Sequence, residues 1–165
     1  MRVLFMCTAN SCRSILSEAM FNHLLSEAMF NHLAPPGFEA CSAGSQPSGR
    51  VHPRSLATLE QAGIATHGLY SKGSEAFEGA PPDIVITVCD AAVGEACPLY
   101  LGAALKAHWG LADPSALDGD EALRDAAFHA TLARIEQRCR AFLGLPFATL
   151  DRDQLKRELE RIGSL

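Results

Sequence analysis

FMCTANSCRSILS, residues 5–17, is the stretch that decides the fold. The apolar run at residues 3–6 precedes it as a buried strand would, and a helical pattern begins at Ser14. Cys7 and Arg13, separated by five residues, therefore lie on a tight loop between a strand end and a helix start. Because the first amides of a helix bind anions, we expect this loop to hold a tetrahedral oxyanion, with Arg13 as a bidentate clamp.

The same loop favours a reactive Cys7. A helix N-terminus and a neighbouring guanidinium both stabilise a thiolate, which is the nucleophilic form of cysteine, and the Ser14 hydroxyl can donate a hydrogen bond to it. A lone cysteine is more often a small buried hydrophobe, but the order strand, cysteine, arginine, helix favours the catalytic interpretation. The predicted oxyanion-binding residues are Thr8, Ala9, Asn10, Ser11, Cys12, Arg13 and Ser14.

The order of elements along the chain predicts an α/β fold. Further strands are expected at residues 38–43, 83–88 and 106–111, and further helices at 51–61, 121–143 and 151–162. This order predicts a three-layer α/β/α domain around a parallel sheet of about four strands. Cys89 directly follows the third strand, so it should lie at the same sheet edge as Cys7. Cys41 and Cys139 are expected in the core.

Composition narrows the class of protein. The 165 residues are 48% apolar and 20% charged, which predicts a single domain over residues 1–165. A net charge of −5 without a basic run argues against nucleic acid or an anionic membrane as a partner. No secretory or membrane-spanning pattern occurs, so we expect a cytoplasmic protein. The six cysteines lack CxxC spacing and no HExxH occurs, so we expect redox or catalytic thiols and no metal site.

A tandem repeat, LSEAMFNHL, occupies residues 16–24 and 25–33 of the first predicted helix. Nine residues turn a helix by roughly 900°, so the two copies present their apolar stripes on opposite sides. We expect the first copy to dock on the sheet and the second to be displaced, either looped out or as an extension that packs on a second molecule. The stripes consist of Leu16, Met20 and Leu24 in the first copy and of Leu25, Met29 and Leu33 in the second.

CTANSCRS at residues 7–14 resembles the signature loop of the low-molecular-weight tyrosine phosphatase fold. That superfamily includes the arsenate reductases coupled to thioredoxin or glutaredoxin. Residues 42–44 (SAG) and 108–115 (HWGLADPS) extend the resemblance, and Ala9 departs from it, since the phosphatases usually carry Gly there. Ser71 and Lys72 resemble a family SK pair, although a solvated loop explains them equally well.

The resemblance implies a thiol-dependent arsenate reductase with no bound cofactor and an external thiol reductant. Cys7 would attack arsenate, Arg13 would hold its oxygens, and Asp113 would protonate the departing oxygen. Cys89 would then attack Cys7 and release arsenite, and Cys97 would take over Cys89 as a disulfide for thioredoxin or glutaredoxin. One alternative is a phosphotyrosine phosphatase, which needs neither of the last two cysteines. Another is a non-catalytic thiol sensor or oxyanion-binding module.

Overall fold

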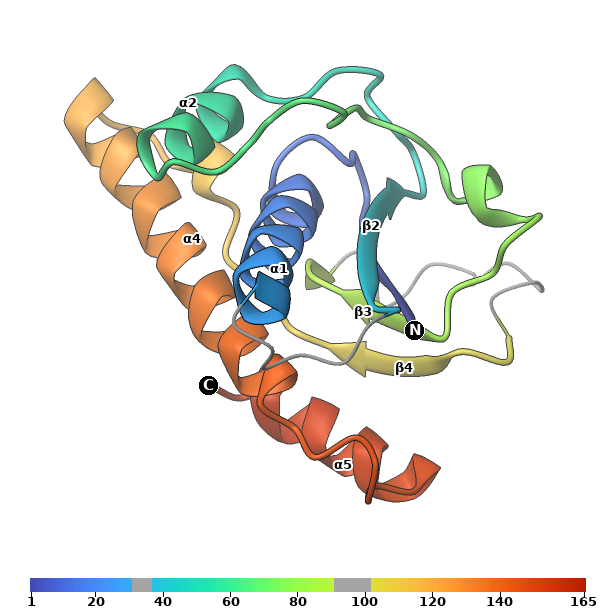
Figure 1. The fold of residues 1–165 in the computed structure, drawn as a ribbon. Coiled ribbons are helices and arrows are strands. Elements are labelled where there is room, and N and C mark those ends of the chain that lie inside the picture. Colours follow the sequence, from blue (N-terminus) through green and yellow to red (C-terminus); the bar gives the residue numbers. More distant parts are fainter. Residues whose placement is uncertain (31–36, 91–101) are drawn as a thin grey trace.

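A four-stranded parallel sheet forms the centre of the molecule (Figure 1). The computed structural model describes residues 1–30, 37–90 and 102–165. The strand order is β2-β1-β3-β4. The strands are β1 (Arg2–Cys7), β2 (Glu39–Gly44), β3 (Ile84–Thr87) and β4 (Leu105–His108).

Helices cover the sheet as the sequence predicted. They are α1 (Arg13–Phe30), α2 (Pro53–Gln61), α4 (Glu121–Leu143) and α5 (Arg152–Gly163), with short 3-10 helices η1 (Ser74–Phe77) and η3 (Pro114–Ala116). Helix α1 lies on one face of the sheet, and α4 runs alongside α1 (Figure 1). None of the helices in the described ranges is long and apolar enough to span a bilayer.

The core has one part on each face of the sheet, which confirms the three-layer α/β/α class. On the α1 face, the Phe5 ring of β1 lies 6.0 Å from the rings of both Phe21 and Trp109. The smaller cluster on the other face includes Leu4 and Val85, with Phe77 of η1 packed against it. The central strands are buried on both faces, which is why their sequences are continuous apolar runs.

Most element bounds agree with the predictions to within two residues. The predicted helix 121–143 matches α4, and Asp151 caps α5 with a complete capping box. The strand predicted at 106–111 is wrong at its end, because β4 stops at His108. There the carbonyls of Trp109 and Gly110 turn to accept hydrogen bonds from Arg138 of α4.

The first copy of the repeat is docked on the sheet, as predicted. Leu16, Met20 and Leu24 are each at most 3% exposed. In the second copy Met29 is 45% exposed, but Leu25 is buried, so the expectation that the second copy would be displaced is wrong for Leu25.

Leu25 is buried because α1 packs on two neighbours, the sheet and α4. It lies one turn after Phe21, whose ring packs 5.3 Å from Phe142 of α4. Leu33 lies outside the described residues. Packing of the second copy on another molecule stays a prediction.

The two copies allow a matched stability test, since Met20 and Met29 hold the same position in each. Met20 is 3% exposed and Met29 is 45% exposed. Met20→Ala should lower the free energy of unfolding by about 2–5 kcal/mol. Met29→Ala should change it by less than about 0.5 kcal/mol. Urea unfolding of both variants measures this, and equal losses would show that both copies are built into the core.

Candidate active site

The loop between β1 and α1 wraps around the sulfur of Cys7, which is 3% exposed. The Asn10 backbone N–H donates to Cys7 Sγ at 3.1 Å, and Ser14 Oγ lies 3.0 Å from the same sulfur. This turn requires Asn10 to adopt φ 45°, a left-handed conformation that Asn tolerates better than most residues. The predicted strand, loop and helix are therefore confirmed, with Cys7 at their junction.

The carbonyl oxygens of the loop accept hydrogen bonds from the segment that follows β2. Those of Cys7, Thr8 and Ala9 accept from the backbone N–H groups of residues 45, 46 and 48 at 2.9–3.2 Å. The Ser11 carbonyl accepts from His52 N–H at 2.8 Å. With these carbonyls engaged outside the loop, the Asn10 amide points at the Cys7 sulfur, and amides that face a common centre in this way can bind an oxyanion.

Asn10 also joins the nucleophile to a buried charge network. Its Nδ2 donates to Ser14 Oγ at 2.9 Å and to Ser42 Oγ at 2.8 Å. Having accepted from Asn10, the Ser14 hydroxyl can give its own proton to Cys7 Sγ, and Ser42 donates to Glu18 Oε2 at 2.6 Å. Hydrogen bonds therefore lead from the Asn10 amide through Ser14 to the Cys7 sulfur, and through Ser42 to the Glu18 carboxylate.

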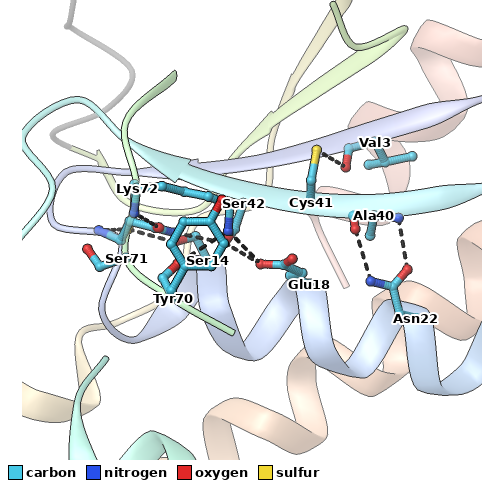
Figure 2. A network of polar contacts seen from close by, with 12 residues as sticks. Val3, Ser14, Glu18, Asn22, Ala40, Cys41, Ser42, Tyr70, Ser71 and Lys72 are labelled. Carbon is cyan, nitrogen blue, oxygen red and sulfur yellow. Dashed lines mark hydrogen bonds and ion pairs between the residues drawn. The ribbon is translucent and has the colours of Figure 1, made fainter. Parts of the chain in front are cut away.

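Lys72 completes this network, and Ser71 Oγ donates to the Ala9 carbonyl of the loop at 3.2 Å, which makes the solvated-loop interpretation wrong (Figure 2). The Lys72 N–H donates to Asn10 Oδ1 at 2.8 Å, which sets the orientation of that amide. Lys72 Nζ lies 3.5 Å from Glu18 Oε2, and both side chains are largely buried. Burial raises the pKa of Glu18, while its contacts with Ser42 and Lys72 oppose the shift.

Arg13 at the start of α1 and Asp113 after β4 form an ion pair. Arg13 Nη2 donates to Asp113 Oδ2 at 3.0 Å, and Nη1 donates to the Leu111 carbonyl at 3.1 Å. Asp113 is the N-cap of η3, where its Oδ1 accepts from Ser115 Oγ at 2.6 Å and Ser115 N–H at 3.0 Å. The structure thus pairs a guanidinium from the start of α1 with a carboxylate from the segment that follows β4.

A second buried thiol lies beside the loop. Cys89, 2% exposed, follows β3, and its Sγ is 3.7 Å from Oγ1 of Thr8, the residue after Cys7. The parallel sheet therefore brings Cys89 to the edge where the sequence placed it. Cys97 lies outside the described residues, so its predicted place in the relay is a sequence-based expectation only.

The chain matches the low molecular weight phosphotyrosine protein phosphatase family over residues 2–159. It belongs to that family. A glutaredoxin arsenate reductase of Synechocystis sp. is 31% identical over 113 residues, which are 68% of this chain and 78% of the relative. A solved arsenate reductase in the phosphate-binding state superposes with a TM-score of 0.67 at 25% identity, over 86% of this chain and 95% of that one. A Corynebacterium glutamicum thioredoxin-dependent arsenate reductase gives 0.59 at 26%, over 84% and 58%.

Within this phosphatase family fold, the other described cysteines are buried thiols. Burial raises the pKa of Cys12 to about 12 and that of Cys41 to about 12. Burial also raises the pKa of Cys139, whose side chain on α4 is fully buried in the core, as predicted. The Cys12 side chain therefore stays protonated at neutral pH, although Cys12 lies in the same loop as Cys7. In the described ranges, no group of three or more His, Cys, Asp or Glu residues could hold a metal ion.

Sequence reasoning missed Gly44, the residue that lets β2 approach the phosphatase loop. A Cβ at this position would lie 2.3 Å from the Thr8 carbonyl oxygen and 2.9 Å from Asn10 N. Both contacts are with backbone atoms, which cannot move aside without displacing the loop. The SAG motif at 42–44 was the available signal, because it supplies both Ser42 and this glycine.

Gly44→Ala should therefore disrupt the oxyanion loop. We expect the concentration of inorganic phosphate that half-protects Cys7 from alkylation to rise by about 10²-fold, as misplacement of a binding group by about 1 Å can do. Gly79→Ala is the control, since nothing lies within 4 Å of a Cβ at that position. Protection that is equal in the two variants would show that the approach of β2 is not needed.

Proposed function

We propose that this chain is an arsenate reductase that supplies two electrons from its own thiols. The observation that carries the proposal is the position of Cys89, a buried thiol whose sulfur contacts Thr8 beside the Cys7 nucleophile. Hydrolysis of a phosphate ester needs one thiol, whereas reduction of arsenic needs two. The similarity to relatives named as arsenate reductases supports the same conclusion.

In the first step the Cys7 thiolate attacks arsenate. A sulfur–arsenic bond forms and an arsenic–oxygen bond breaks, with the oxygen leaving as water after Asp113 protonates it. Arg13 has five N–H donors, so it can hold oxyanion oxygens as well as the Leu111 carbonyl. The ion pair with Arg13 keeps the Asp113 carboxyl group beside the oxyanion that Arg13 would hold, where it can protonate the departing oxygen.

In the second step Cys89 attacks the sulfur of Cys7. A disulfide forms, the sulfur–arsenic bond breaks, and its electron pair reduces arsenic from As(V) to As(III), which leaves as arsenite. Cys97 then attacks Cys89, which frees Cys7 and leaves a Cys89–Cys97 disulfide. A dithiol carrier of the thioredoxin or glutaredoxin class reduces this disulfide, in keeping with the names of two similar proteins.

Single-cysteine variants test the proposal. Cys7→Ser and Cys89→Ser should each abolish arsenite production from arsenate in the presence of thioredoxin or glutaredoxin. Cys41→Ser is the control, because Cys41 is a buried thiol on β2 that donates to the Val3 carbonyl and does not contact the loop (Figure 2).

The same variants should be assayed for hydrolysis of an aryl phosphate. If Cys89→Ser hydrolyses it as fast as the parent chain and the parent makes no arsenite, the protein is a phosphatase. If neither reaction occurs while phosphate protects Cys7 from alkylation, the loop is an oxyanion-binding or thiol-sensing module.

Asp113→Asn tests the general acid. We expect the rate of the first step to fall by about 10²- to 10⁴-fold, because the amide cannot protonate the departing oxygen. Phosphate protection of Cys7 should change little, since the single Asn oxygen can still accept from Ser115 to cap η3 and the Leu111 carbonyl still holds Arg13. Rapid-quench measurement of the first turnover checks this. An equal loss of rate and of phosphate affinity would make Asp113 only a structural residue of η3.

A further inference from the structure

Arg138 of α4 is a buried cation outside the site described so far. It is 4% exposed, and burial lowers the pKa of its guanidinium. Its Nη1 donates to the carbonyl oxygens of Trp109 at 2.9 Å and Gly110 at 3.1 Å. Its Nη2 donates to the backbone oxygens of Gly163 at 2.9 Å and Leu165 at 3.2 Å.

Joining these backbone segments through a buried charge is energetically unfavourable. Removing a guanidinium from water is unfavourable unless its partners compensate, and buried cations are usually paired with carboxylates. Three acceptors of Arg138 are the backbone carbonyls of Trp109, Gly110 and Gly163, and the fourth is the main-chain oxygen of Leu165, the last residue of the sequence. Among the described residues, no side-chain carboxylate pairs with Arg138 and its Nε has no hydrogen-bond partner. A methionine would fill similar space without that penalty. The hydrogen-bond donors of the guanidinium are therefore what Arg138 contributes at this position.

The segment that Arg138 holds leads directly to the oxyanion site. The carbonyl of Leu111, the next residue after Gly110, accepts from Arg13 Nη1 at 3.1 Å, and the Leu111 N–H donates to the Val88 carbonyl beside Cys89. Asp113, two residues further on, accepts from Arg13 Nη2 at 3.0 Å. Both acceptors that orient Arg13 therefore lie within three residues of the carbonyls held by Arg138.

Residues 108–110 are also packed against α5. A Cβ at Gly163 would lie 2.4 Å from the His108 carbonyl oxygen and 2.9 Å from Cδ1 of Trp109. The Trp109 indole N–H donates to the Leu159 carbonyl at 2.8 Å. Residues 108–110, which lead toward Asp113, are therefore held by α5 and by Arg138 of α4.

We propose that Arg138 is a positioning residue for the oxyanion site, acting through the Trp109 and Gly110 carbonyls to set where the Leu111 carbonyl holds Arg13. The inference deepens the proposed function, because Arg13 is the group that would grip arsenate. It requires only that the loop binds a tetrahedral oxyanion, so it can be tested apart from turnover.

The test is protection of Cys7 from iodoacetamide by inorganic phosphate in the full chain. Arg138→Met should raise the half-protecting phosphate concentration by about 10- to 100-fold, since a displacement of about 1 Å at the guanidinium costs that much. The alkylation rate without phosphate should stay within about twofold of the parent rate, because Arg138 does not contact the loop that holds Cys7. A variant that merely unfolds would instead expose Cys7 and accelerate this rate.

Arg134→Met is the matched control. Arg134 lies one turn earlier on α4 and donates to the Leu165 oxygen at 3.0 Å, an acceptor that it shares with Arg138. This variant weakens the tie to Leu165 but leaves the Trp109 and Gly110 carbonyls held. Its phosphate protection should equal that of the parent chain.

Arg138→Lys provides a second measurement if Arg138→Met does not fold. An ammonium keeps the charge but cannot present the planar fork, so phosphate protection should weaken by a smaller factor than in a folded Arg138→Met. Parent-like protection in a folded Arg138→Met or Arg138→Lys chain, or equal weakening in Arg134→Met, would overturn the proposal. Weaker protection in a chain that makes no arsenite would leave the positioning role intact and refute only the reductase.

Discussion

The left-handed turn at Asn10 is the constraint on which the site depends. With φ at 45°, Asn10 brings its own N–H to the Cys7 sulfur and sends its side-chain amide toward Ser14 and Ser42. The Lys72 N–H fixes which end of that amide donates. One residue thus links β1, α1, β2 and the segment around Lys72, so the nucleophile is held by four parts of the chain rather than by its loop alone.

This arrangement gives different environments to the thiols of Cys7 and Cys12, which are five residues apart in one loop. Cys7 receives hydrogen-bond donors at its sulfur, whereas burial raises the pKa of Cys12 to about 12. The chemistry is therefore set by which way each side chain faces, and not by membership of the loop. The same distinction applies to Cys89, which is buried like Cys41 but contacts Thr8 at the sheet edge where Cys7 lies.

Local pattern predicted the frame of this molecule and most of its site. The apolar run at 3–6, the helix start and the third strand were readable because their signals lie within a few residues, and parallel strands then bring Cys7, Cys89 and Asp113 to one edge. Single charged residues gave no such signal. Glu18 and Lys72 are 54 residues apart in sequence, and Arg138 sits on a helix whose apolar stripe predicts burial of other positions.

The error at Leu25 has a similar cause. One apolar stripe predicts one buried face of a helix. Helix α1 packs on both the sheet and α4, so two of its faces are covered. Ser71 and Lys72 were equally compatible with a solvated loop, because nothing near them in sequence shows that their partners are Ala9, Asn10 and Glu18. Long-range polar contacts of this kind become visible only once the fold is known.

Single-turnover stoichiometry tests the central claim, that Cys7 and the neighbouring Cys89 reduce a bound oxyanion. The fully reduced chain is mixed with arsenate without any external reductant, and arsenite and free thiols are counted. Because reduction of As(V) takes two electrons, the account predicts one arsenite released and two thiols lost per chain. Consumption of no thiols and release of no arsenite, with phosphate still protecting Cys7 from alkylation, would contradict it.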